Sequence, residues 1–262
     1  QGALQTAGEY YRETGNTGPY GPETGTGQLS CRQNFTILTT DGFWNDQSNF
    51  NAGATGNSDA TSTTGIPRPP GDTGTVFAYT AGAPYSDTWA STLADVAMKY
   101  WKTDLRTDLS NKVPATTDDP AYWQHMTTFG ISIGLQGTLN PATALSQPGP
   151  SNDLTDGGLT WPSPLVAENA ARIDDLFHAA VNGRGEFVAA TNSQPFAAGL
   201  RASLAAISRR LASGSSVATT GPRVTGSNKV FSASYFSGSW NGEVAAYTLT
   251  TTGIVDTPVW KA

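Results

Sequence analysis

The sequence predicts an α/β fold with a largely parallel sheet over residues 31–212. Short runs rich in β-branched and aromatic residues alternate there with longer segments whose apolar residues recur every three or four positions. Strands that alternate with helices form parallel sheets, because each crossover helix returns the chain to the same end of the sheet. The 262 residues are enough to bury a core of this kind.

The composition limits the classes of partner. Charged residues make up only 14% of the chain, and the net charge is −6. Nucleic acids and anionic lipids bind basic surfaces, so neither is expected as the main partner. The sequence has no run of about 18 apolar residues and no signal segment. Its weakly charged surface, rich in Gly, Thr, Ser and Asn, is typical of secreted bacterial proteins, and its start without Met indicates a piece of a longer protein.

The first predicted element is a helix over residues 4–11, followed by a Gly/Pro-rich loop over residues 15–27. Cys31 is the only cysteine, so an internal disulfide is excluded. It is either a buried free thiol or paired with chain outside this sequence. Residues 35–38 then predict a buried strand that ends at Asp41.

Asp41 is the candidate metal ligand of the sequence. Ligands and metal ions bind at the carboxyl ends of strands in open α/β sheets. The long polar loop that follows offers further oxygen ligands for Mg²⁺ or Ca²⁺ in Asn45, Asp46 and Asn49. Their spacing lacks the terminal glutamate of an EF-hand. The alternatives are a solvated loop and an ordinary turn, since Asp-Gly is a common turn pair.

The remaining elements of the α/β region follow in order. Asp87 is expected to cap a helix with an apolar face from Trp89 to Trp101. A second strand is predicted over residues 127–135, where apolar residues alternate with Gly and Ser, and residues 137–164 form an irregular insertion.

The region closes with another helix, a strand and a helix. A helix is predicted over residues 167–181, ending in a glycine turn at residues 182–185. A third strand covers residues 187–188. Asn192 or Ser193 then caps the last helix, which carries an apolar stripe.

The composition changes after residue 212. Residues 213–227 have the Ser/Thr/Gly composition of a linker. Residues 230–236 and 243–249 predict a β-hairpin, and residues 255–260 a further strand. Two or three strands bury too little surface to fold alone. We therefore expect this tail to be the first piece of a larger β-structure.

A series of motifs resembles, in order, the PilY-type type IV pilus tip adhesins. The first is CRQNFTILTTDGFWN at residues 31–45, around the strand that ends at Asp41. The others are TLADVAMKYWKTDLR, WQHM, IDDLFHAAVNGRG and SWNG, at residues 92–106, 123–126, 173–185 and 239–242. An ordered series that spans most of the chain is far more specific than any one motif.

The resemblance implies a von Willebrand factor A-like (Rossmann-type) partial domain with long loop insertions, followed by a β-hairpin that begins a β-propeller. It divides the chain into the tail of an upstream segment (1–30), the later part of the von Willebrand A-like domain (31–212), a linker (213–227) and the first propeller strands (228–262). In such domains an Asp-x-Ser-x-Ser loop, a threonine and a later aspartate hold a metal, and Asp41 matches the last of these. By the resemblance, that loop would lie before Gln1 and is not in this chain. Residues 59–63 have a similar spacing but follow no apolar strand, so they are not taken as the loop.

The resemblance also implies a function. It is that of a surface-exposed, non-enzymatic factor of pilus biogenesis, adhesion and twitching motility at the pilus tip or outer membrane. The implied partners are minor pilins and the tip complex, a host or abiotic surface receptor, and the rest of the same polypeptide. The alternatives are a secreted metal-dependent hydrolase that uses Asp41 and a purely structural spacer. His125 and His178 are expected at the core edge or as caps, because no nucleophile motif accompanies either.

Overall fold

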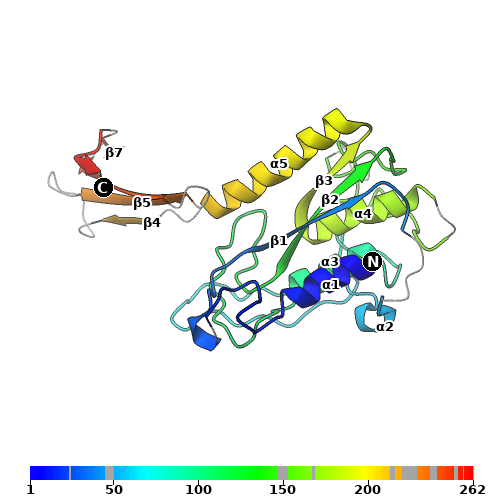
Figure 1. Cartoon of the computed structure of the whole chain (residues 1–262), viewed down its shortest axis with the longest axis horizontal. Helices are drawn as coiled ribbons and strands as arrows, with labels where there is room; N and C mark the ends of the chain where they lie inside the picture. The colour runs from blue at the N-terminus through cyan, green and yellow to red at the C-terminus, as the bar shows by residue number, and fades with distance from the viewer. Residues whose placement is uncertain are drawn as a thin grey trace. The chain divides into compact units, whose positions relative to one another are not determined.

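The protein folds into two compact units, Gln1–Leu204 and Ala205–Ala262, in the computed structural model shown in Figure 1. The first unit is a mixed α/β structure around a three-stranded parallel sheet, which confirms the predicted class. The structure describes residues 1–23, 25–44, 50–146, 153–166, 169–212, 216–219, 229–236, 241–250, 253–255 and 257–261.

The sheet consists of β1 (Asn34–Thr40), β2 (Met126–Ile133) and β3 (Arg184–Ala190), parallel and in chain order. β2 confirms the second predicted strand and is the central one. It is buried along nearly its whole length, on both faces, whereas its apolar alternation alone would indicate one buried face. β3 approaches it so closely at Gly185 that an added Cβ would lie 2.0 Å from the backbone oxygen of Thr128. Only glycine fits there, because backbone cannot yield as a flexible side chain can.

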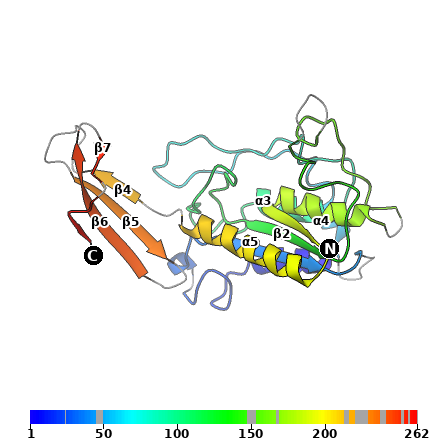
Figure 2. The same cartoon turned by 90° about the horizontal axis from the view of Figure 1, so that it is seen from above.

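Helices cover both faces of the sheet. α4 (Ala171–Asn182) packs on β2 and β3, where Phe187 contacts its apolar residues. The next residue, Val188, faces Gly199 in the first part of α5 (Ser193–Ala212). Successive strand residues point to opposite faces, so α5 lies on the face opposite α4. Figure 2 shows β2 between these two helices.

The face that α4 covers also carries two further helices. α3 (Leu93–Lys102) packs along α4, and α1 (Gly2–Tyr10) packs on α3. The contact between them is close at Gly8, where an added Cβ would lie 2.4 Å from the Tyr100 ring. The core under these helices contains Leu4 together with apolar residues of α3, α4 and β2.

The expected start of α3 at Asp87 is wrong. Ser91 has a φ of 64°, a left-handed conformation that a helix cannot contain, so the apolar pattern before it is not helical. Thr92 is the N-cap, and its side chain accepts from the backbone N–H of Asp95. The Asp95 carboxylate accepts from the N–H of Thr92 in return, which completes a capping box.

Asp175 of α4 joins the two helices at the start of α3. Its Oδ1 accepts from the N–H of Ala94, and its Oδ2 from the N–H of Leu93, both at 3.0 Å. Oδ2 also accepts from the indole N–H of Trp44 at 3.0 Å. Burial raises the pKa of Asp175 to about 6, although the two backbone hydrogen bonds act to lower it. The positive end of the α3 dipole favours the ionised carboxylate here.

Several other boundaries differ from the expectations. β3 begins at Arg184, inside the turn expected at residues 182–185, and Arg184 itself has a φ of 59°. The long polar loop contains the short helix α2 (Ala52–Thr55), and the Gly/Pro-rich loop contains the 3₁₀ turn η1 (Gly25–Gly27). Cys31 is exposed, so the buried-thiol alternative is wrong. These are places where backbone geometry or tertiary contacts override local composition.

The second unit is an antiparallel sheet. The predicted hairpin is confirmed, since its two strands pair from Lys229 with Thr248 to Phe236 with Asn241. A further strand pairs with it from within residues 213–227, so part of the expected linker is a strand. Pairing with a neighbouring backbone imposes this conformation whatever the composition. The strands are β4 (Ser216–Thr219), β5 (Lys229–Phe236), β6 (Asn241–Thr250), β7 (Gly253–Ile254) and β8 (Trp260–Lys261).

Replacing Asp175 by alanine should lower the free energy of unfolding by about 2–4 kcal/mol, because three buried donors lose their acceptor. Chemical denaturation measures the loss, and amide hydrogen exchange at Leu93 and Ala94 locates it. Asp174→Ala is the matched control. The neighbouring carboxylate accepts from Thr138 and from the N–H of Leu139 and does not cap α3. Unchanged exchange at Leu93 and Ala94 in Asp175→Ala would contradict the assignment.

Candidate functional site

The structure places Asp41 at the carboxyl end of β1, as predicted, with its side chain exposed. Thr40 forms the turn beside it, because its Oγ1 donates to the Gly42 carbonyl at 2.8 Å. A cavity of about 250 Å³ adjoins this end and is lined in part by Thr40, Gly42 and Trp44. Asn45, Asp46 and Asn49 lie outside the described residues. The metal-binding role of Asp41 stays a prediction.

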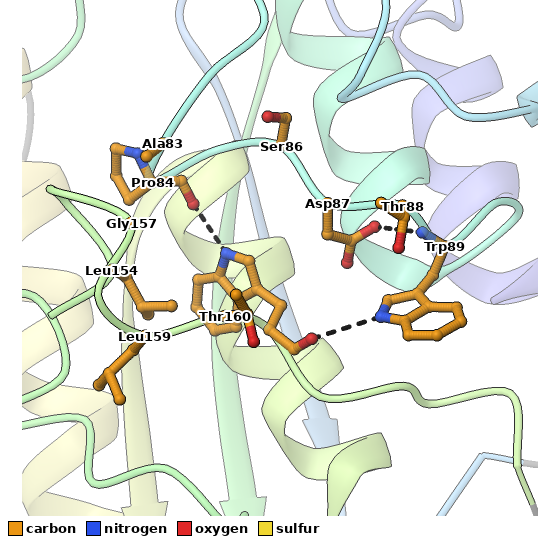
Figure 3. Close-up of a pocket in the computed structure, with 11 residues that line it drawn as sticks. Ala83, Pro84, Ser86, Asp87, Thr88, Trp89, Leu154, Gly157, Leu159 and Thr160 are labelled. Carbon is orange, nitrogen blue, oxygen red and sulfur yellow. Dashed lines mark hydrogen bonds between the residues drawn. The ribbon is translucent and has the colours of Figure 1, made fainter. Parts of the chain in front are cut away.

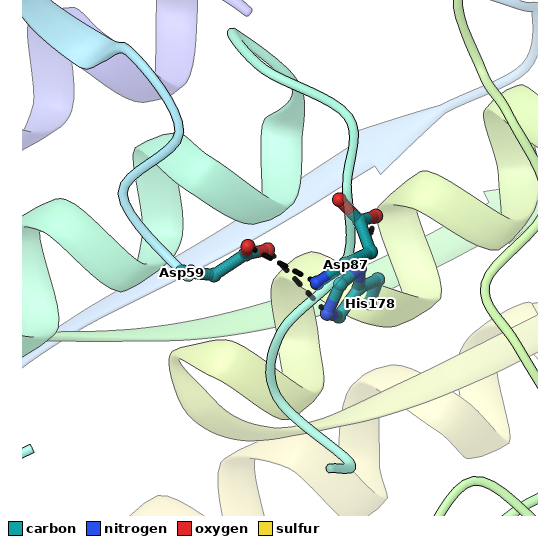
Figure 4. A group of neighbouring side chains, drawn as sticks. All are labelled: Asp59, Asp87 and His178. Atoms are coloured by element: carbon teal, nitrogen blue, oxygen red, sulfur yellow. Dashed lines mark hydrogen bonds and ion pairs between the residues drawn. The ribbon is translucent and has the colours of Figure 1, made fainter. Parts of the chain in front are cut away.

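A different group of side chains is close enough to share a metal ion. Among the described residues, Asp59, Asp87 and His178 bring one ligand atom each within 4.8 Å of the others. Figure 4 shows the three side chains converging from separate segments. Asp59 lies near the start and Asp87 near the end of the long connection from α2 to α3, and His178 lies on α4. The side chains of Asp59 and His178 are 0% and 1% exposed, and that of Asp87 is 7% exposed.

His178 is held on every side. Its Nε2 lies 2.8 Å from the carbonyl oxygen of Tyr85 and 3.7 Å from Oδ2 of Asp59. Its Nδ1 lies 3.4 Å from Oδ2 of Asp87. Trp161 stacks on the ring, with centroids 4.0 Å apart and planes 8° from parallel. The imidazole is therefore fixed in one orientation, deeper in the core than the core-edge position that we expected.

Asp59 is buried among other acidic groups. Its carboxylate accepts from the N–H of Asp87 and from Nδ2 of Asn182, both at 3.2 Å. Its own backbone N–H donates to Oδ1 of Asp95 at 3.2 Å. Burial raises the pKa of Asp59 to about 8, with the charges of Asp95 and Asp87 adding to the effect. Without a cation, this carboxyl group is therefore largely protonated at neutral pH.

Lys102 is the nearest fixed cation on α3. Its Nζ donates to the carbonyl oxygens of Ser58 and Thr61, at 2.5 Å each. Burial lowers the pKa of Lys102, while the carboxylates of Asp59 and Asp95 act in the opposite direction. The ammonium of Lys102 thus holds the loop around Asp59 against α3 by binding backbone carbonyls of that loop.

A cavity of about 390 Å³ opens beside the cluster. Figure 3 shows Asp87 on its wall. Oδ1 of Asp87 accepts from the N–H of Trp89 at 2.7 Å. The indole N–H of Trp89 donates to the carbonyl of Trp161 at 3.3 Å, and that of Trp161 to the carbonyl of Pro84 at 2.7 Å. Asp87 therefore lies between the cavity and the buried His178, where a small ion could enter.

The second histidine has a simpler environment. Nε2 of His125 lies 3.1 Å from Oδ2 of Asp119, which also accepts from Thr127. The other oxygen of Asp119 accepts from the indole N–H of Trp101 at 3.0 Å. The carboxylate of Asp119 thus binds side chains of His125, Thr127 and Trp101, and this arrangement fits a structural role for His125 in the core.

Sequence reasoning missed the buried cluster. It considered Asp59 only as an oxygen ligand of the polar loop and for its resemblance to an Asp-x-Ser-x-Ser spacing, and Asp87 only as a helix cap. The one local signal is the spacing of Asp174, Asp175 and His178 in the IDDLFH motif, which places acidic and imidazole groups near one another on a helix. Asp59 and Asp87 lie 28 residues apart in one irregular connection and far from His178 along the chain, and no periodic pattern reveals that they meet.

The chain resembles curated pilus proteins along almost its whole length. It is 32% identical over 292 residues to the type IV pilus biogenesis factor PilY1 of Pseudomonas aeruginosa strain PAK, an alignment that covers 99% of this chain. The PilY1 proteins of strains PAO1 and UCBPP-PA14 are 32% and 33% identical, again over 99% of the chain. The resemblance to the PilY-type proteins that the motifs indicate is thus confirmed.

These matches cover part of each relative. The chain spans about a quarter of the length of the curated relatives, 24% in each case. No protein-family model and no solved structure matches the chain. None of the described helices is long and apolar enough to span a bilayer.

The raised pKa of Asp59 predicts a pH dependence in chelator-treated protein. An unfolded aspartate releases its proton near pH 3.9, whereas the folded Asp59 keeps it up to about pH 8. The folded state therefore binds more protons in this interval, and the free energy of unfolding falls as the pH rises through it. The stabilisation that protonated Asp59 gives the folded state is fully present below about pH 4 and is lost above about pH 8.

Asp59→Asn should flatten this slope between pH 6 and 8, as urea unfolding at several pH values would show. Asp72→Asn is the control. That carboxylate is exposed and paired with Arg68, and the hydrogen bonds from the N–H of Gly74 and from Arg68 hold its pKa below the usual range. A wild-type slope in Asp59→Asn would contradict the assignment.

Proposed function

We propose that this chain is a functional part of a type IV pilus biogenesis factor that acts at the bacterial surface or pilus tip. The observation that carries the proposal is its similarity, over 99% of its length, to three proteins named type IV pilus biogenesis factor. The weakly charged, acidic composition is compatible with an extracellular location and gives no basic surface for nucleic acid.

The segment corresponds, in this proposal, to the later part of a von Willebrand factor A-like domain and the first strands of a β-propeller. Three parallel strands in chain order support the first part, because consecutive crossovers on one side of such a sheet produce this order. The position of Asp41 at the end of β1 fits the last metal ligand of such domains. The antiparallel strands from β4 onward support the second part.

The proposed role is non-enzymatic and depends on binding. The long connections from β1 to α3 and from β2 to α4 leave the sheet at the carboxyl ends of their strands. Loops on a rigid α/β scaffold commonly carry recognition, so these connections are the proposed surface for minor pilins, the tip complex or a surface receptor. No observation favours the hydrolase alternative, since Asp41 is exposed and outside the buried cluster.

The function is tested by deletion of the gene for the full-length protein and by restoration with variants. We expect deletion to abolish surface pili, twitching and attachment, and the wild-type gene to restore them. Gly185→Val should fail to restore them, because its side chain cannot fit against Thr128. Cys31→Ser, at an exposed position, should restore them fully.

The same experiment can refute the proposal. If deletion leaves piliation, twitching and attachment unchanged, the chain has another role. A spacer is distinguished from a binding module by measuring binding of the purified chain to isolated pili and minor pilins. A spacer binds neither, whereas a recognition segment binds at least one of them.

A further inference from the structure

We propose that Asp59, Asp87 and His178 form a binding site for one divalent transition-metal ion, with Zn²⁺ as the representative ion. The ion would tie the two ends of the connection from α2 to α3 to each other and to helix α4. The site is separate from Asp41 and from the end of β1, where the sequence predicts a metal. Three observations support the inference.

The first observation is the hydrogen bonding of the imidazole. The carbonyl oxygen of Tyr85 can only accept, so Nε2 of His178 carries a proton at this 2.8 Å contact. Nδ1 is left facing Oδ2 of Asp87 at 3.4 Å. Nδ1 of His178 and Oδ2 of Asp87 are both acceptors, so either a proton or a metal ion must lie between them. A ring N–H donated to a backbone carbonyl is the usual support of a metal-bound histidine.

The second observation is the balance of buried charge. Four aspartates, each less than 9% exposed as a residue or side chain, surround His178 in one connected network: Asp59, Asp87, Asp95 and Asp175. The cations that face them in the described structure are Lys102, His178 and, toward Asp175, the amino group of Gln1. Asp95 and Asp175 are compensated by the N-terminus of α3, whereas Asp59 and Asp87 lack a helix end. Two ionised carboxylates can be buried here only with a compensating charge, and a divalent ion would supply it in place of the proton on Asp59.

The third observation is an unsatisfied oxygen next to the cluster. Asn182 is fully buried and donates through Nδ2 to Asp59 and to the carbonyl of Ala94. Its Oδ1 has no hydrogen-bond partner in the described structure. Buried polar atoms are almost always paired, so an unpaired oxygen here indicates a missing donor or cation.

The ligand chemistry favours a transition metal. Zn²⁺ binds imidazole nitrogen and carboxylate oxygen at about 2.0–2.2 Å, which separates two ligands of a tetrahedral ion by roughly 3.4 Å. The Nδ1–Oδ2 distance of His178 and Asp87 is 3.4 Å. Oδ2 of Asp59 lies on the Nε2 side of the ring, 3.7 Å from that nitrogen, so Asp59 is the more distant of the two carboxylate ligands. Ca²⁺ and Mg²⁺ prefer oxygen ligands alone, so a site with an imidazole selects against them. Stacking on Trp161 keeps the ring in place for the ion.

The test is metal binding by the purified 262-residue chain in a Cys31→Ser background, which removes an exposed thiol that could also bind Zn²⁺. After chelator treatment, calorimetric titration should show one Zn²⁺ per chain and no comparable binding of Ca²⁺. At a free Zn²⁺ concentration of 100 times Kd, the Tm should rise by about 5–10 °C. Co²⁺ in place of Zn²⁺ should give the visible absorption of a low-symmetry site.

Asp87→Asn and His178→Gln should weaken Zn²⁺ binding by about 100-fold or more, since each removes a ligand. His125→Gln is the matched control, because His125 is similarly buried but pairs with Asp119, outside the cluster of Asp59 and Asp87. The proposal is overturned if the unsubstituted site takes up no stoichiometric Zn²⁺ and ¹⁵N spectra show both ring nitrogens of His178 protonated with Zn²⁺ present. That result would identify a proton as the bridging particle, and it needs no variant to fold.

Discussion

The fold depends on the way in which buried carboxylates meet the N-terminus of α3. Asp175 supplies both oxygens to the first turn of this helix and also binds the indole of Trp44, which lies shortly after the end of β1. Asp95 closes the same turn from within. Without these N–H groups the carboxylates would be uncompensated charges in the core, and without the carboxylates the helix would begin with unsatisfied donors. Each group thus makes the burial of the other possible.

The same contact explains why the separate sequence motifs form one physical unit. Trp44, Leu93 and Asp175 come from the first, second and fourth of the PilY-like segments, and they meet in one set of hydrogen bonds. The third segment joins through Trp123, whose indole N–H donates to the carbonyl of Trp101 at 2.8 Å. Much of the resemblance therefore lies in residues that position the helices on the sheet, and the connecting loops are free to differ in any recognition role.

Local patterns predicted the sheet and most helices, because each depends on the burial of its own periodic face. The strands β1, β2 and β3 and the hairpin of the second unit follow directly from alternating or continuous apolar runs. The start of α3 could not be predicted in this way, since a single left-handed residue, Ser91, interrupts an otherwise suitable pattern. β4 could not be predicted either, because its conformation comes from pairing with β5 and not from its own residues.

The candidate site residues differ in the same way: some are recognisable from the local sequence, and others only from contacts between distant parts of the chain. Asp41 is visible in the sequence because a strand end is a local feature, whereas the environment of Asp59 is created by distant parts of the chain. Asp59 becomes a strongly perturbed acid only when its loop is folded under Lys102 and against Asp95, which brings it to His178. A loop that solvent surrounds would keep the ordinary acidity of an aspartate. The burial that hides this cluster from sequence reasoning is also what creates the need for a cation between its carboxylates and the imidazole.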